Sequence, residues 1–271
     1  MPHIHSTSYG ESRLRVLRVG GRGDRHVPRD VTIALRFEGR FDGAFRGDGA
    51  TLVPGEAVKN LVHRVARDER HDTIEELGLA LAHTILAGHA SIGLARIELS
   101  EQPWARLEPG GKPHGRAFTP AGVERRTAVV TSNGSRVSVS SGVENLVLMR
   151  SAEPAAAGEA REQPRLLVAA LSAKWGYGSG EIAFAPYRQG VHAAIVQTFA
   201  WHDGALQQTL YAIADVIMAT YQEVVTVALS LQQFPYRASD LLELAVDGDA
   251  LFVAHNEPLD VIDITVERGH P

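Results

Sequence analysis

The sequence predicts an α+β fold in which helices lie on antiparallel sheets. The first part of the chain reads as two strands, two helices and another strand, an order that differs from the regular strand–helix alternation of a parallel sheet. The second part also reads as strands, a helix and further strands, which suggests a quasi-duplicated fold without a literal sequence repeat. Asn133-Gly134, between two strand-like runs, is the favoured two-residue turn of an antiparallel hairpin.

The first half contains a hairpin, two helices and a third strand. Alternating apolar residues predict a strand at 31–38, which pairs with an arginine-rich strand at 12–19. After a glycine-rich loop, a helix carries its apolar residues on one face, at Val58, Leu61, Val62 and Val65. A second helix begins at a capping box formed by Thr73 and Glu76, whose side chains satisfy free backbone N–H groups. A strand follows at 92–99.

The middle of the chain contains a proline-rich loop and the clearest hairpin. The loop covers residues 101–122, and the hairpin strands at 125–132 and 135–141 flank the Asn-Gly turn. A separate strand is expected at 143–149. Residues 152–163 are rich in Ala, Glu and Pro and have no apolar period, which predicts a flexible linker or surface loop.

The second half is organised around the stretch Ala205–Tyr236. Apolar spacing of three and four residues predicts a helix, and the alternation that follows predicts a half-buried strand. Gln207 opens this helix and Gln233 closes this strand, positions suited to line a ligand site, although surface glutamines give the same pattern. Further strands are expected at 166–175, 191–200, 241–246, 251–252 and 261–266.

Composition excludes several classes of function. The 271 residues permit one large domain or two ordinary ones, and a net charge of -5 does not favour nucleic-acid binding. No apolar run approaches the roughly 18 residues that span a bilayer, and the N-terminus lacks the pattern of a signal peptide. Because there is no cysteine, disulfides and Cys nucleophiles are excluded, and a cytoplasmic location is expected.

Common catalytic motifs are absent from the chain. There is no phosphate loop, no dinucleotide fingerprint, no Gly-x-Ser-x-Gly elbow and no His-Glu-x-x-His. His3 and His5 have metal-like spacing, but such a pair near a terminus more often binds nothing, so no metal site is expected. These residues alone indicate an α+β protein of unassigned chemistry.

Short landmarks along the chain resemble the urate oxidase (uricase) family. The resemblance runs from about Tyr9 to Glu267, and the order and spacing of the landmarks are more specific than any one of them. The landmarks are Tyr9-Gly10, Val58-Lys59-Asn60, Gly111-Lys112-Pro113-His114 with Ala117-Phe118, Arg165-Leu166-Leu167 ten residues before Trp175, Gln207 with Thr209-Leu210-Tyr211, and Ser230-Leu231.

The resemblance implies a tandem tunnelling fold (T-fold). Two modules, expected at residues 9–142 and 143–271, would each form an antiparallel four-stranded sheet with helices on one face. The family forms homotetramers that enclose a barrel, with active sites between subunits. Its members act in purine metabolism and oxidise urate with molecular oxygen as co-substrate, using no metal, flavin or other cofactor.

One half of the family's site is matched in this sequence. Arg165 matches the arginine that clamps urate, and Gln207 matches the glutamine that pairs with the dione edge of the ring. Leu206 stands where the family uses a backbone N–H, and Gln233 is a further substrate-binding candidate. A planar guanidinium opposite an amide is suited to a flat, oxo-substituted heterocycle.

The catalytic half departs from the family pattern. Glu11 stands at the family's lysine, and Gly55 at its catalytic threonine. Gln233 and Pro235 stand at the asparagine and histidine that end the strand, and residues 152–163 contain no counterpart of the phenylalanine that stacks on urate. The resemblance therefore implies that most catalytic residues of the family are lost, with Glu11 as a candidate replacement base.

Several interpretations remain open. The chain is either a uricase-like oxidase with altered chemistry, preferentially acting on a planar heteroaromatic ring other than urate, or a urate oxidase with a changed site. A catalytically inactive homologue that binds a purine-like ligand is the alternative, in which Arg165 pairs with a local acid and Gln207 caps its helix. A zinc-dependent pterin enzyme of the same fold would need a histidine cluster, which His3 and His5 do not provide.

Overall fold

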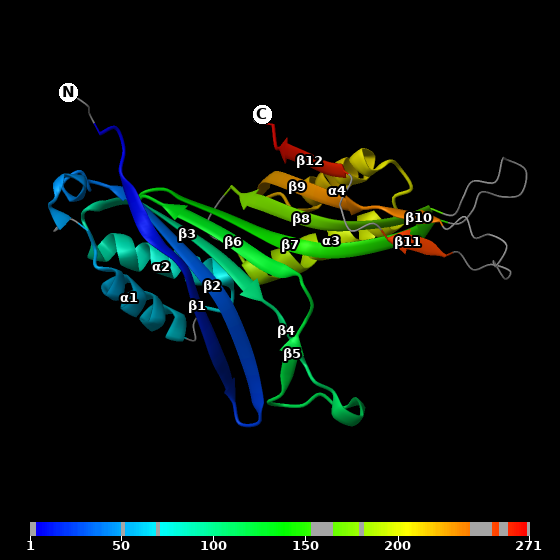
Figure 1. The fold of residues 1–271 in the computed structure, drawn as a ribbon, viewed down its shortest axis with the longest axis horizontal. Helices are drawn as coiled ribbons and strands as arrows, with labels where there is room; N and C mark the ends of the chain where they lie inside the picture. Colours follow the sequence, from blue (N-terminus) through cyan, green and yellow to red (C-terminus); the bar gives the residue numbers. More distant parts are fainter. Residues whose placement is uncertain are drawn as a thin grey trace, which may run out of the picture.

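An eight-stranded antiparallel sheet forms the centre of the structure, a computed structural model that describes residues 4–49, 52–68, 71–152, 165–178, 182–238, 251–254 and 260–269 (Figure 1). The strands follow one another across the sheet in chain order, so that each pairs with its sequence neighbour. They are β1 (Ser8–Arg22), β2 (Arg25–Gly39), β3 (Ile92–Gln102), β6 (Arg125–Ser132), β7 (Val137–Ala152), β8 (Arg165–Tyr177), β9 (Val224–Phe234) and β12 (Asp260–Glu267).

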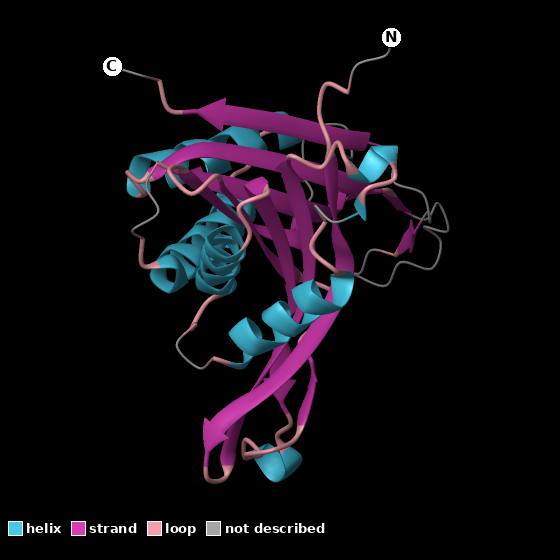
Figure 2. Cartoon of the chain, turned by 90° about the vertical axis from the view of Figure 1, so that its left-hand side faces the viewer, coloured by secondary structure: helices cyan, strands magenta, loops and turns pink. Residues whose placement is uncertain are grey.

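Four helices cover one face of this sheet (Figure 2). They are α1 (Gly55–Arg67), α2 (Ile74–Gly88), α3 (Phe184–Trp201) and α4 (Leu206–Thr220). The smaller elements are the 3-10 turns η1 (Ala44–Arg46) and η3 (Pro109–Gly111), the strand pair β4 (Trp104–Arg106) with β5 (Phe118–Pro120), and the pair β10 (Tyr236–Ala238) with β11 (Phe252–Ala254).

The main elements repeat one pattern twice. Two strands, two helices and two strands run from β1 to β6, the first module, and again from β7 to β12, the second module. The first strand of each carries a register shift at a non-glycine residue with positive φ, Arg13 (60°) in β1 and Asn145 (57°) in β7. The arrangement agrees with the tandem antiparallel modules that the resemblance implies.

The core lies between the sheet and the helices. In β2 the predicted alternation holds, because Val31, Ile33, Leu35 and Phe37 are all buried. From α2 and α4, residues such as Leu81 and Leu210 complete one continuous apolar cluster that both modules share. The capping box of α2 is also present, since Thr73 Oγ1 accepts from Glu76 N at 3.2 Å.

The strand expected at residues 191–200 is wrong, because this segment lies inside helix α3. Its buried residues are Val191, Ile195 and Phe199, which are spaced four apart as on one face of a helix. The segment is rich in alanine and other apolar residues. Its hydrophobic pattern therefore did not distinguish a helix from a buried strand.

The hairpin at residues 125–141 is confirmed, but its connection differs from the prediction. Ser132 pairs with Val137, so the loop has four residues, 133–136, and Asn133 N donates to Arg136 O at 3.2 Å. The separate strand expected at 143–149 is the continuation of β7 beyond its bulge. The expected module boundary after residue 142 therefore falls inside β7, and the repeat divides more simply at residues 133–136.

Other differences are smaller. The proline-rich loop at 101–122 contains the β4–β5 pair, which was not expected. The strand expected at 241–246 and nearly all of the linker expected at 152–163 lie outside the described residues. No helix in the described part of the chain combines the length and the apolar content needed to cross a membrane.

Candidate functional site

The start of β1 is fixed against the segment that leads into α1. The hydroxyl of Tyr9 accepts a hydrogen bond from Val53 N at 2.9 Å. The Tyr9 ring packs edge-on against Phe37 and Phe41, with centroid distances of 5.4 and 4.6 Å. Burial raises the pKa of Tyr9 above its ordinary value, so the phenol stays neutral near pH 7. Strand β1 and the N-terminus of α1 are thereby held side by side.

Glu11 occupies the space above Gly55 at this junction. In the β1–β2 register Glu11 pairs with buried Leu35, and directly paired residues share a face, so its side chain points toward the helices. A Cβ built on Gly55 would stand 2.4 Å from Oε1 of Glu11, closer than real contacts allow. The bulge around Arg13 follows immediately and bends this edge strand. The Glu11 carboxylate thus fills the space that a side chain at residue 55 would occupy.

Helix α1 supplies a cation beside this carboxylate. Lys59 Nζ lies 3.1 Å from Glu56 Oε1 in the first turns of α1. The hydrogen bond with Glu56, and after it the negative charges of Glu56 and Glu11, raise the pKa of Lys59, so the amine stays protonated. In the sequence Lys59 served only as a landmark, although its spacing of three residues from Glu56 is a signal for a helical ion pair.

The N-terminus of α4 presents Gln207 to the exterior. The neighbouring Gln208 folds back, so that its Oε1 accepts from Ala205 N at 3.1 Å and caps the helix. Gln207 is exposed, and no other described residue hydrogen-bonds its side chain. Leu206 is half-buried against the core. The amide of Gln207 is therefore available to a ligand, while Gln208 does the capping.

A polar turn before α4 fixes the position of this helix start. His202 Nδ1 lies 3.0 Å from Oγ1 of fully buried Thr209, and Gly204 N donates to the same ring nitrogen at 3.2 Å. Arg150 of β7 binds the carbonyls of Phe199 and His202 at the end of α3. The contacts of Arg150 were not expected from sequence, because they join residues that are 49 and 52 positions apart along the chain.

The other candidates of the second module gather at one end of β8 and β9. Gln233 pairs with Ala169 of β8, and Pro235 is buried just after β9. Arg165 is the first residue of β8, so its backbone lies at this same end, while its side chain lies outside the described residues. Helix α4 runs antiparallel to β9, and its 15 residues extend about 22 Å. Its start, with Gln207, therefore also lies toward this end.

One chain does not bring the two groups of candidates together. Five inter-strand steps separate β1, with Glu11, from β8, with Arg165, which is about 24 Å at about 4.8 Å per step (Figure 1). A small heterocycle cannot span that distance. Glu11 and the Arg165–Gln207 pair can meet at one ligand only if they come from two copies of the chain.

The residues of the described ranges do not form a metal site. No three His, Asp or Glu residues gather there closely enough to hold an ion. Of the terminal pair, His5 is exposed, and His3 lies outside the described residues.

Comparison with known proteins gives a consistent result. The profile described as Uricase matches residues 7–131 and 139–262. The uricase of Arthrobacter globiformis is 28% identical over 276 residues, which covers 98% of this chain and 90% of that protein. The uricase of Dictyostelium discoideum is 24% identical and covers 100% of this chain and 99% of that protein.

Solved structures agree with the sequence relatives. The crystal structure of uricase from Arthrobacter globiformis superposes with a TM-score of 0.87 at 26% identity, over 100% of this chain and 98% of that one. A uricase from Bacillus fastidious shares the fold, with a TM-score of 0.77 at 17% identity, over 96% and 93%. The two profile matches together cover both modules of the sheet, and the chain therefore belongs to the uricase family.

Proposed function

We propose that this protein is a cofactor-independent oxidase of the uricase type. Its substrate is urate or, preferentially, another planar oxo-substituted heteroaromatic ring, held between the guanidinium of Arg165 and the amide of Gln207. Family membership supports the reaction class. The side-chain amide of Gln207 supports the clamp, because it is exposed and Gln208 caps the helix in its place. The change at Glu11, from a cation in the family to a carboxylate here, is the reason to prefer a ring other than urate.

The observation that carries the proposal is the contact between Glu11 and Gly55. Because residue 55 has no side chain, the Glu11 carboxylate reaches the N-terminus of α1. There it serves as the base that removes a proton from a ring N–H. The electron-rich ring anion then gives two electrons, and a second proton, to molecular oxygen. The resulting hydroperoxide anion takes the first proton back from Glu11, so O₂ leaves as H₂O₂ and the ring is oxidised by two electrons.

Each site is proposed to form between two copies of the chain. One copy contributes Glu11, and the other contributes Arg165, Gln207, Leu206 and Gln233. This arrangement accords with the separation of about 24 Å within one chain, at about 4.8 Å per strand step, and with the homotetramer that the family resemblance implies. The edge strands β1 and β12 each have one side without a partner strand in the described sheet, where a second copy can join.

A catalytically inactive ring-binding protein is the second candidate. The residues at the family's threonine and histidine positions, Gly55 and Pro235, have no side chain that transfers a proton. In this case the clamp of the second module would bind a purine-like ligand without converting it.

Aerobic incubation with a panel of purine and pterin rings, urate included, distinguishes the two candidates. Loss of ring absorbance together with oxygen uptake is expected for at least one ring. A ring that raises the melting temperature but is recovered unchanged would favour the binding protein instead. If no ring binds or reacts, both candidates are rejected.

A further inference from the structure

A pocket of about 540 Å³ lies on the helix-bearing side of the sheet, at the seam between the two modules. The first module contributes Arg29, Glu101 and Arg126, and the second contributes Arg188 and His192. Its volume falls in the range of small-molecule sites, about 300 to 1,000 Å³. None of the residues assigned to ring binding or to proton transfer lines it. The pocket is therefore separate from the proposed oxidase site.

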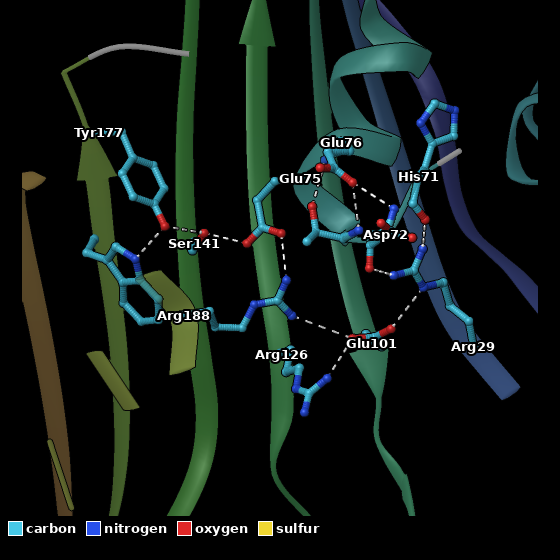
Figure 3. A network of polar contacts seen from close by, with 12 residues as sticks. Arg29, His71, Asp72, Glu75, Glu76, Glu101, Arg126, Ser141, Tyr177 and Arg188 are labelled. Atoms are coloured by element: carbon cyan, nitrogen blue, oxygen red, sulfur yellow. Dashed lines mark hydrogen bonds and ion pairs between the residues drawn. The ribbon is translucent and has the colours of Figure 1, made fainter. Parts of the chain in front are cut away.

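A buried polar network that joins the modules adjoins this pocket and includes two of its lining residues, Arg188 and Trp175 (Figure 3). Glu75 of α2 is fully buried, and one of its oxygens accepts from Ser141 while the other accepts from Arg188 Nη2 at 2.7 Å. Ser141 also accepts from Tyr177 at 3.0 Å, and Tyr177 from Trp175 at 2.8 Å. Both oxygens of Glu75 thus accept hydrogen bonds, and the bond from Nη2 fixes the position of the Arg188 guanidinium.

Among the residues that line the pocket, three guanidinium groups share a single carboxylate (Figure 3). Glu101 lies 3.3 Å from Arg29 Nε, 3.5 Å from Arg126 Nη1 and 3.6 Å from Arg188 Nη1. Charge-assisted N–H···O bonds are normally about 2.7–2.9 Å long. These contacts are longer, so Glu101 does not saturate the donors that point at it.

The arginines that line the pocket have donors that the described residues do not use. Arg188 Nε makes no hydrogen bond with any described residue, although it is shielded from solvent. Arg126 has a side chain that is 47% exposed and a single acidic contact, so most of its donors also remain open. A ligand with acceptor oxygens in the pocket can bind the exposed donors of Arg126.

Two further acids line the pocket, Glu124 and Asp72, and the first of them is paired with a histidine. His192 lies 3.4 Å from Glu124. The hydrogen bond with Glu124 raises the pKa of His192, which favours the imidazolium. The positive charge of His192 offsets the negative charge of the Glu124 carboxylate, while Asp72 is exposed and precedes α2.

We propose that this seam pocket binds a small molecule through a carboxylate or phosphate group, held by Arg126 and Arg188. The ligand spans both modules, because Arg126 belongs to β6 and Arg188 to α3. Its binding therefore stabilises the assembled two-module chain. The site is independent of oxidase chemistry, and its test needs no turnover.

The test uses thermal unfolding and titration calorimetry of the full chain with inorganic phosphate and, separately, with malonate. Sodium chloride at equal ionic strength corrects for screening. Saturable binding and a raised melting temperature are expected for one of the two anions, and which one it is distinguishes phosphate from carboxylate ligands. Neither anion exceeding the chloride control would overturn the proposal.

Matched arginine variants locate the binding. Arg126→Gln removes a ligand donor from a half-exposed position, and affinity should fall about tenfold or more, as expected for a lost charge-assisted hydrogen bond. Arg96→Gln is the control, since Arg96 is 41% exposed and pairs with Glu98 away from the pocket. Arg188 is not substituted in this test, because its removal would leave the buried carboxylate of Glu75 without its ion-pair partner. Equal affinity in Arg126→Gln and Arg96→Gln contradicts the assignment.

Discussion

Oε1 of Glu11 lies so close to Gly55 that a Cβ at residue 55 would stand 2.4 Å from it. The two residues are 44 positions apart in the sequence and belong to different elements, β1 and the start of α1. The Glu11 carboxylate can therefore take this position only because residue 55 has no side chain.

A Gly55→Ala variant tests this dependence. The added methyl should push the flexible Glu11 side chain aside and leave the backbone in place, so the free energy of unfolding should change by about 0.5 kcal/mol or less. Turnover should fall by about 10²-fold, because a base displaced by about 1 Å loses its alignment. Gly88→Ala is the matched control, since a Cβ there meets nothing within 4 Å. Unchanged turnover in Gly55→Ala would separate Glu11 from catalysis.

Mixed oligomers test whether the site is shared between chains. Glu11→Gln and Gln207→Ala should each lower activity when expressed alone. Co-expression of the two should restore part of it, because some interfaces then combine an intact Glu11 with an intact Gln207 from the other chain. Steady-state oxygen uptake of the co-purified mixture measures this. Activity no higher than the average of the two variants would argue for a site within one chain.

The buried pair of Glu75 and Arg188 should matter to stability. Arg188→Met leaves Glu75 charged and without its partner in the core, and should lower the free energy of unfolding by about 3–5 kcal/mol. The double variant Glu75→Met/Arg188→Met should recover most of this loss. Denaturant unfolding monitored by circular dichroism gives both values. Arg96→Met, at an exposed ion pair, should change the value by less than about 1 kcal/mol.

The contact of His192 with Glu124 predicts a pH dependence of stability. The pKa of His192 is raised in the folded state, mainly by its hydrogen bond with Glu124, and Arg126 opposes the shift. Its contribution is therefore complete below the unfolded value of about 6.5 and is lost as pH rises through the higher folded value. The effect should be less than about 1 kcal/mol, because the pair is partly exposed. Unfolding curves of the wild type and Glu124→Gln across this range should converge as pH rises.

The fold was largely predictable from local patterns. The alternation in β2, the capping box of α2 and the helix–strand unit of α4 and β9 each depend on residues close together in sequence, and all three are present in the structure. Helix α3 was not predicted, because its segment contains so many alanine and apolar residues that the helical period of about 3.6 residues and the strand period of two cannot be told apart. The bulge at Asn145 leaves β7 continuous, which no local pattern indicates.

The site was predictable only in part. The resemblance named Glu11, Gly55 and Gln207, but it did not show that the first two touch or that Gln208 caps α4 in place of Gln207. Glu75 looked like an ordinary acid in the first turn of a helix. Its complete burial depends on Arg188, which lies 113 residues away, and such long-range packing leaves no local signal.

The most direct test of the proposed function compares wild type and Glu11→Gln on the ring that the wild type oxidises. Glutamine keeps the shape of the side chain but cannot take the proton. Oxygen uptake should fall by about 10²- to 10⁴-fold, the usual contribution of a general base. Ring affinity, measured without oxygen, should stay within a few-fold, because Arg165 and Gln207 provide the binding. Full turnover by Glu11→Gln would contradict the account.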